Sequence, residues 1–203
     1  MLFDINTDNP QVRLIQKVVA IVQDGGIICY PTDTGYGIGC DMFDQKAIKR
    51  LMQIKRRPKD KPFSFMCSGL QNISEYAHVS NTAYRLLKKC LPGPYTFVLP
   101  GTKLVPKIMA TKQKTVGIRV PASSICQLLL ETLGNPIITT SIPTDDAALP
   151  PAEAYEIDRL LGARIDAIID GGPHFSDPSS LIDLTRDTPE ILRIGKGDVS
   201  LFR

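Results

Sequence analysis

The 203-residue sequence has no tryptophan and only two histidines, and aromatic residues make up 6% of it. Neither His78 nor His174 lies beside a serine or cysteine in a nucleophile motif, and no HExxH pattern or cluster with metal-ligand spacing occurs. These absences argue against a serine or cysteine hydrolase and against a metal centre held by the protein. They favour a reaction driven by charge placement and substrate orientation, such as nucleotidyl transfer.

Cysteine is present five times but never in a CxxC motif. This pattern predicts reduced thiols in a cytoplasmic protein. No apolar run approaches the ~20 residues that cross a bilayer, so we expect no membrane partner. The mixed, acidic first ten residues are not typical of a signal peptide.

The composition is that of a globular chain, with 43% hydrophobic and 22% charged residues and a net charge of +3. Such a small charge does not by itself require a nucleic-acid partner. The length fits one domain, and no repeat or long linker divides the chain. We expect residues 1–203 to form a single α/β domain, with a core of about 10–200.

Amphipathic and short apolar segments mix irregularly along the chain. Capping residues and glycines delimit the predicted helices, which span 10–24, 44–55, 81–91, 123–134 and 154–162. Short apolar runs mark the predicted strands, which span 27–30, 63–67, 95–99, 115–121, 136–141, 165–172, 179–184 and 190–195. Because several strands follow each other directly near the C-terminus, the sequence predicts a mixed sheet.

The stretch YPTDTGYGIGCD, residues 30–41, carries glycines at alternate positions. Its spacing matches neither the GxGxxG of dinucleotide sites nor a P-loop, and no helix follows directly, so a phosphate loop is excluded. We interpret the glycines as turns that let the backbone close around a ligand. Thr32 and Thr34 would project from the same face of an extended segment and hold a small polar ligand, although such hydroxyl pairs are often structural.

Positive charge concentrates in KRRPKDKP, residues 55–62. A solvated loop is the default interpretation, but Lys55 and Arg57 stand where a helix ends, a position that suits a polyphosphate. Arg119 interrupts the apolar strand GIRVP, where it suits a ligand carboxylate or a structural salt bridge. Hydroxyls at the strand ends 138–141 and 178–184, with Arg193 nearby, suggest one polar cleft.

Six motifs occur in an order that resembles the YrdC-like family, which includes threonylcarbamoyl-AMP synthases. They are GGIICYPTDTGYGIGCD, KRRP, PGPYTFVL, GIRVP, SSLIDL and ILRIGKGD. The resemblance covers about residues 10–200 and is closest to the YciO branch. It implies a twisted, open mixed sheet flanked by helices, with a concave basic cleft.

The resemblance also implies an activity. ATP, L-threonine and bicarbonate would give threonylcarbamoyl-AMP and pyrophosphate, for the t6A modification of tRNA. Mg²⁺ would arrive with ATP, and no tightly bound metal is expected.

The site residues that the resemblance implies fall into three groups. Lys55 and Arg57 would be catalytic. The threonine site would comprise Thr32, Thr34, Arg119, Thr139 and Ser179. The nucleotide site would comprise Lys55, Arg57, Lys61, Thr115, Ser141 and Arg193.

Two departures from the family pattern keep alternatives open. Pro143 replaces the asparagine of an S-x-N element, which removes a side-chain amide and a backbone donor. Met66 stands where many relatives have a polar residue near the substrate. One alternative is an enzyme that acts on a threonylcarbamoyl-adenosine group in the opposite or hydrolytic direction. The other is a module that binds tRNA, double-stranded RNA or the ribosome without catalysis.

Overall fold

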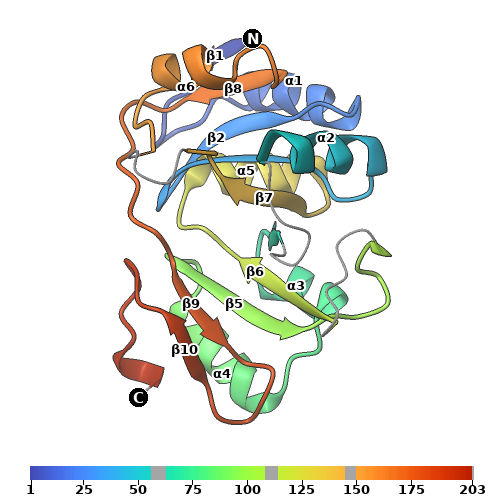
Figure 1. Ribbon diagram of the computed structural model, residues 1–203, viewed down its shortest axis with the longest axis vertical. Coiled ribbons are helices and arrows are strands. Elements are labelled where there is room, and N and C mark those ends of the chain that lie inside the picture. The colour runs from blue at the N-terminus through green and yellow to red at the C-terminus, as the bar shows by residue number, and fades with distance from the viewer. Residues whose placement is uncertain (56–62, 108–113, 145–149, 203) are drawn as a thin grey trace.

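The computed structural model describes residues 1–55, 63–107, 114–144 and 150–202 (Figure 1). Its helices are α1 (Val12–Gln23), α2 (Gln45–Lys55), α3 (Leu70–Tyr76), α4 (Asn81–Cys90), α5 (Ser124–Leu133) and α6 (Ala154–Leu161). Its strands are β1 (Leu2–Asp4), β2 (Ile28–Thr32), β3 (Gly35–Asp41), β4 (Ser64–Met66), β5 (Tyr95–Pro100), β6 (Thr115–Arg119), β7 (Ile137–Ser141), β8 (Ala167–Asp170), β9 (Ser180–Asp183) and β10 (Glu190–Arg193). None of these helices is long and apolar enough to cross a membrane.

The strands form one ten-stranded sheet in the order β1-β8-β2-β3-β7-β4-β6-β5-β9-β10. Parallel pairs such as β4–β6 and antiparallel pairs such as β2–β3 occur in the same sheet, which confirms the predicted mixed architecture. The sheet runs along the long axis of the molecule, with the N-terminus at one end and the C-terminus at the other (Figure 1).

Helices cover both faces of the sheet, and side-chain alternation decides which residues face which helices. In β2, Ile28 and Tyr30 pack into the core with α1 and α5, whereas Cys29 packs into the core with α2, α3, α4 and α6. Thr32 shares the parity of Tyr30, so it projects from the α1/α5 face at the point where that helical cover ends.

Local capping signals locate some helix ends and miss others. Asp44 accepts hydrogen bonds from the amides of Lys46 (2.7 Å) and Ala47 (2.9 Å), which confirms the predicted start of α2. The predicted start of α1 at residue 10 is wrong: Asn6 Oδ1 accepts the amides of Asp8 and Asn9 (both 2.9 Å), which stabilises a turn before the helix. Helix α4 begins at Asn81 as expected, but the cap is the hydroxyl of Ser80.

The interpretation of the glycines in residues 30–41 as turns is wrong for two of the three. Gly37 and Gly39 lie inside β3, which pairs antiparallel with both β2 and β7. A Cβ on Gly37 would stand 3.4 Å from Tyr30 Cε2, and one on Gly39 would stand 2.8 Å from the Tyr30 hydroxyl. The glycines therefore leave room for the Tyr30 ring, and only Gly35, with φ +103°, serves the hairpin turn.

All five cysteines are free, as the sequence predicts, and all five are buried. Burial raises the pKa of Cys40, Cys67 and Cys126 to about 12, so roughly one thiol in ten thousand is ionised at pH 8. We expect the native protein to resist a disulfide reagent such as DTNB at pH 8. Unfolding in guanidinium should release five reactive thiols per chain. Rapid labelling of the native protein would contradict this burial.

A polar pocket as the candidate active site

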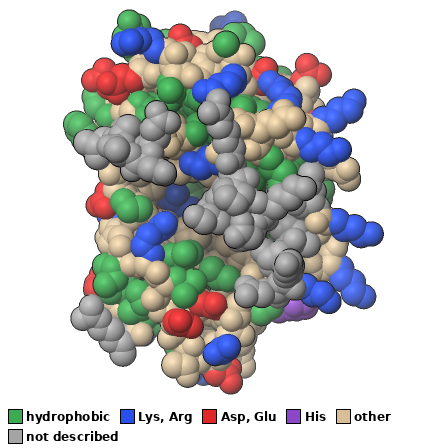
Figure 2. Space-filling model, viewed as in Figure 1, with side chains coloured by type: hydrophobic (Ala, Val, Ile, Leu, Met, Phe, Trp, Pro, Cys, Tyr) green, Lys and Arg blue, Asp and Glu red, His purple; other side chains and the backbone are tan. Residues whose placement is uncertain are grey.

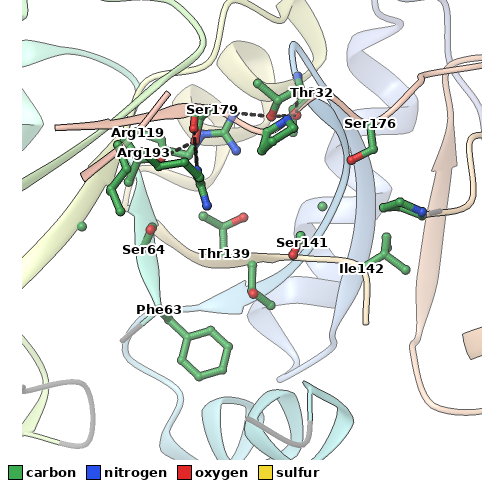
Figure 3. Close-up of a pocket in the computed structure, with 18 of the residues that line it drawn as sticks. Thr32, Phe63, Ser64, Arg119, Thr139, Ser141, Ile142, Ser176, Ser179 and Arg193 are labelled. Atoms are coloured by element: carbon green, nitrogen blue, oxygen red, sulfur yellow. Dashed lines mark hydrogen bonds between the residues drawn. The ribbon is translucent and has the colours of Figure 1, made fainter. Parts of the chain in front are cut away.

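A pocket of about 640 Å³ opens on the α1/α5 face of the sheet, beyond the part that these helices cover (Figure 3). Strands β2 to β7, β9 and β10 contribute to its walls. The predicted site residues that the structure describes all line it: Thr32, Thr34, Lys55, Thr115, Arg119, Thr139, Ser141, Ser179 and Arg193. Arg57 and Lys61 lie outside the described residues.

The charge of the lining is positive. Lys55, Arg119 and Arg193 belong to it, whereas none of its described residues is acidic or a histidine. Figure 2 shows further Lys and Arg side chains along the right-hand edge of one face of the molecule. The pocket therefore suits an anionic ligand.

Thr32 is the last residue of β2 and Thr34 lies in the hairpin turn between β2 and β3, so the two threonines do not lie along one strand. The Thr32 hydroxyl donates to Gly35 O (2.6 Å) and accepts from the Thr34 amide (3.1 Å). The two hydroxyl oxygens are 3.2 Å apart, and both side chains are buried. Because the proton of Thr32 is engaged by Gly35 O, the Thr34 hydroxyl is the donor in the contact between the two hydroxyls.

Arg119 forms a salt bridge, which is one of the two roles that the sequence predicted for it. Its Nη2 donates to Asp33 Oδ1 (2.9 Å) and to Thr34 Oγ1 (2.7 Å). The side chains of Arg119 and Asp33 are 17% and 9% exposed. The amide of Ala122 donates to the other oxygen of Asp33 (3.0 Å). Arg119 Nε is buried and has no hydrogen-bond partner among the described residues, so the guanidinium keeps a donor for a ligand.

Arg193 lies beside Ser179 at the same end of the pocket as Arg119. Its Nε and Nη2 donate to Ser179 O (3.0 and 2.8 Å), and Nη2 also lies 3.2 Å from Ser179 Oγ. Burial and the nearby charge of Arg119 lower the pKa of Arg193. The sequence grouped Arg193 with the nucleotide residues, but its contacts group it with Ser179, a residue of the predicted threonine site.

Lys55, the last residue of α2, is held against the C-terminal end of β7. Its Nζ donates to Ser141 O (2.9 Å), Ser141 Oγ (3.0 Å) and Ile142 O (3.2 Å). Lys55 and Ser141, two residues of the predicted nucleotide site, are therefore in direct contact. Pro143 follows immediately and offers neither an amide proton nor a side-chain donor.

Sequence reasoning missed several polar residues of the site. Tyr36, Ser64, Thr96 and Ser176 line the pocket. Asp33 could have been predicted as the partner of Arg119. It stands between the two predicted threonines, and a buried arginine needs an acidic partner. Met66 was expected near the substrate, but it is not among the lining residues and is buried in the core with α1 and α5.

The described residues contain no group of three or more His, Cys, Asp or Glu side chains that could hold a metal ion. The donors that line the pocket are hydroxyls and cations, which are poor ligands for Mg²⁺.

A family model, a curated relative and a solved structure each match most of this chain. A family model described as "Sua5_yciO_yrdC: Telomere recombination" matches residues 20–195. The uncharacterized protein YciO of Escherichia coli K12 is 45% identical over 201 residues, which is 98% of both chains. The crystal structure of E. coli YciO matches with a TM-score of 0.96 at 44% identity, covering 100% of this chain and 99% of that one.

Two more distant relatives are described by activity or by ligand. The threonylcarbamoyl-AMP synthase of Xanthomonas campestris pv. campestris B100 is 33% identical over 166 residues, 80% of this chain and 88% of that protein. The structure of Pyrococcus abyssi Sua5 complexed with L-threonine has a TM-score of 0.87 at 30% identity, covering 96% of this chain and 57% of that one.

Proposed function

Because the chain belongs to the Sua5/YciO/YrdC family, we propose that its pocket converts L-threonine, bicarbonate and ATP into threonylcarbamoyl-AMP and pyrophosphate. The observation that carries this proposal is the meeting of hydroxyls, arginines and Lys55 in one pocket of about 640 Å³. Relatives named threonylcarbamoyl-AMP synthase and the L-threonine complex of P. abyssi Sua5 support it.

L-threonine would occupy the end of the pocket formed by Thr34, Arg119 and Thr139. Arg119 is oriented by Asp33 and retains a buried Nε without a partner among the described residues, which suits the carboxylate of an amino acid. The Thr34 hydroxyl lines this end of the pocket and accepts from Arg119, so it helps to hold the guanidinium beside the ligand. A site built to satisfy these groups discriminates against ligands that leave them unpaired.

The nucleotide would lie toward Lys55 and Ser141. A carbamate oxygen of N-carboxythreonine attacks the α-phosphorus of ATP, the bond to the bridging oxygen breaks, and pyrophosphate leaves. Lys55 and the predicted partners Arg57 and Lys61 would neutralise the phosphates, and the contacts of Lys55 to β7 fix its position. Mg²⁺ bound to ATP would supply further charge neutralisation, without a ligand from the described residues.

Proton transfer in this reaction needs no protein base from the described lining. L-threonine enters with an ammonium group, and its amine must lose a proton before it reacts with bicarbonate. The described lining contains no acidic residue and no histidine, so it offers no carboxylate or imidazole to accept that proton. Positioning and charge neutralisation then carry the catalysis.

The test of the proposal is pyrophosphate release by the purified protein with L-threonine, bicarbonate, ATP and Mg²⁺, with the adenylate detected by mass spectrometry. Thr34→Val removes a hydroxyl that Arg119 contacts, so we expect the KM for L-threonine to rise about 10- to 100-fold. Thr132→Val, on α5 and outside the lining, is the matched control and should leave KM unchanged. Absence of pyrophosphate and adenylate with the wild-type protein would refute the synthase function.

The proline at position 143 favours a second candidate, an enzyme that acts on a threonylcarbamoyl-adenosine group in the reverse or hydrolytic direction. The loss of an amide donor beside Ser141 would weaken the grip on ATP more than the grip on threonine. Incubation with t6A-containing tRNA, followed by nucleoside mass spectrometry, distinguishes this candidate, because only a reverse or hydrolytic enzyme would consume the modified nucleoside.

A further inference from the structure

We propose that Arg193, Ser179 and Thr96 form the bicarbonate subsite of this pocket, next to the L-threonine site at Arg119. The same subsite would then hold the carboxylate that bicarbonate contributes to N-carboxythreonine. This inference rests on the proposed function and assigns one of its three substrates to residues.

The guanidinium of Arg193 is held in place by hydrogen bonds to its neighbours. Arg193 donates through Nε and Nη2 to Ser179 O, and Ser179 Oγ lies 2.7 Å from Thr96 Oγ1. Thr96 and Ser179 are each only 5% exposed. Figure 3 shows Arg193 and Arg119 at the same end of the pocket as Ser179. The contacts of Arg193 to Ser179 are partly buried, and they hold the guanidinium in place before any ligand arrives, which lowers the cost of binding.

The guanidinium of Arg193 keeps few N–H donors for a ligand. Arg193 Nη1 makes no hydrogen bond to the residues that the structure describes, whereas Nε and Nη2 are both engaged by Ser179. The forked grip that arginine usually presents to a phosphate is therefore already occupied. One free edge, with the hydroxyls of Ser179 and Thr96 beside it, suits a small planar anion instead.

Positive charge is concentrated around Arg119 and Arg193. Arg119 and Arg193 lie close enough for the charge of one to act on the other, and the Nζ of Lys196 donates to Asp33 O (2.7 Å). Asp33 is the one carboxylate that pairs with Arg119 among the described residues. Like charges held together in a partly buried site repel each other, and an anion between them relieves the repulsion.

The chemistry of the intermediate matches this pair of arginines. The threonine amine attacks the carbon of bicarbonate, the bond from that carbon to its hydroxyl oxygen breaks, and an amine proton leaves with the hydroxyl as water. The product, N-carboxythreonine, carries two carboxylates whose carbons are three covalent bonds, or about 3 Å, apart. Two cations in one pocket suit a dianion of this size, with Arg119 at the threonine carboxylate and Arg193 at the new one.

The test compares Arg193→Gln with the wild-type protein in buffers depleted of carbon dioxide and supplied with known bicarbonate. We expect the KM for bicarbonate to rise at least about tenfold, while the KM values for L-threonine and ATP change less than about threefold. Arg193→Lys retains the charge and should recover part of the bicarbonate affinity. Arg186→Gln, an exposed arginine between β9 and β10, is the matched control and should change none of the three.

Different results would contradict the bicarbonate subsite and the proposed function. A rise confined to the KM for ATP would assign Arg193 to the phosphates and overturn the subsite, while leaving the synthase function in place. If the wild-type protein forms no adenylate, the proposed function fails instead. The subsite is then tested alone by ¹³C NMR line broadening of labelled bicarbonate with L-threonine present. Equal broadening with the wild-type protein and Arg193→Gln, or none with either, would overturn it.

Discussion

Replacing Arg119 with alanine is expected to weaken L-threonine binding more than about 100-fold and to lower the free energy of unfolding by about 2–4 kcal/mol. The substitution removes the donor to Asp33 Oδ1 at 2.9 Å and to Thr34 Oγ1 at 2.7 Å. Among the described residues, the carboxylate of Asp33, whose side chain is 9% exposed, would keep only the amide of Ala122 as a partner. Isothermal titration with L-threonine and urea unfolding measure the two effects.

A surface ion pair provides the matched control for this prediction. Arg50 and Asp166 are 3.0 Å apart with side chains 45% and 36% exposed, and Arg50→Ala should cost no more than about 1 kcal/mol. The double variant Asp33→Ala, Arg119→Ala should recover part of the lost stability, because no unpaired carboxylate remains, yet should not bind L-threonine. Unchanged threonine affinity in Arg119→Ala would refute the role given to this arginine.

Replacing Gly39 with alanine is expected to lower the free energy of unfolding by about 3 kcal/mol or to prevent folding. A Cβ at this position would lie 2.5 Å from Ile138 O, 2.6 Å from Ile137 Cγ2 and 2.8 Å from the Tyr30 hydroxyl. The carbonyl belongs to β7, which pairs with β3 on one side and β4 on the other, so it cannot move without distorting the sheet. Urea unfolding monitored by circular dichroism measures the change.

Gly69→Ala is the control for the Gly39 prediction. Nothing lies within 4 Å of a Cβ at Gly69, which has extended backbone (φ −179°) before α3. The expected change is no more than about 1 kcal/mol, the scale of a helix-capping effect. Equal losses of stability in the two variants would mean that crowding against β7 is not the cause.

The parts of the fold that were predictable are those with local causes. Helix α5 was located at both ends, because the Ser123 hydroxyl accepts from the Cys126 amide and Gly134 adopts a left-handed φ of 81°. Strand β3 was missed because alternating glycines have a low preference for strands, and their reason lies in Tyr30 and β7. Helix α3 and strand β1 were also not predicted, and both are too short to show a clear period.

The candidate site was predictable as a set of residues but not as an arrangement. Each hydroxyl or cation at a strand end was visible in the sequence, and those described do line one pocket. Their pairing was not visible, because Arg119 meets Asp33 across 86 residues and Lys55 meets Ser141 across the same separation. The grouping of Arg193 with Ser179 depends on the register of β10 against β9.

The order of the strands along the chain has a consequence for biosynthesis. A ribosome makes the hairpin that carries Thr32 and Thr34 early, but it makes Ser179, Arg193 and Lys196 near the end. A nascent chain that has emerged only as far as β8 therefore lacks one end of the pocket. A ligand that contacts both ends of the pocket can stabilise the fold by mass action only after translation has passed β10.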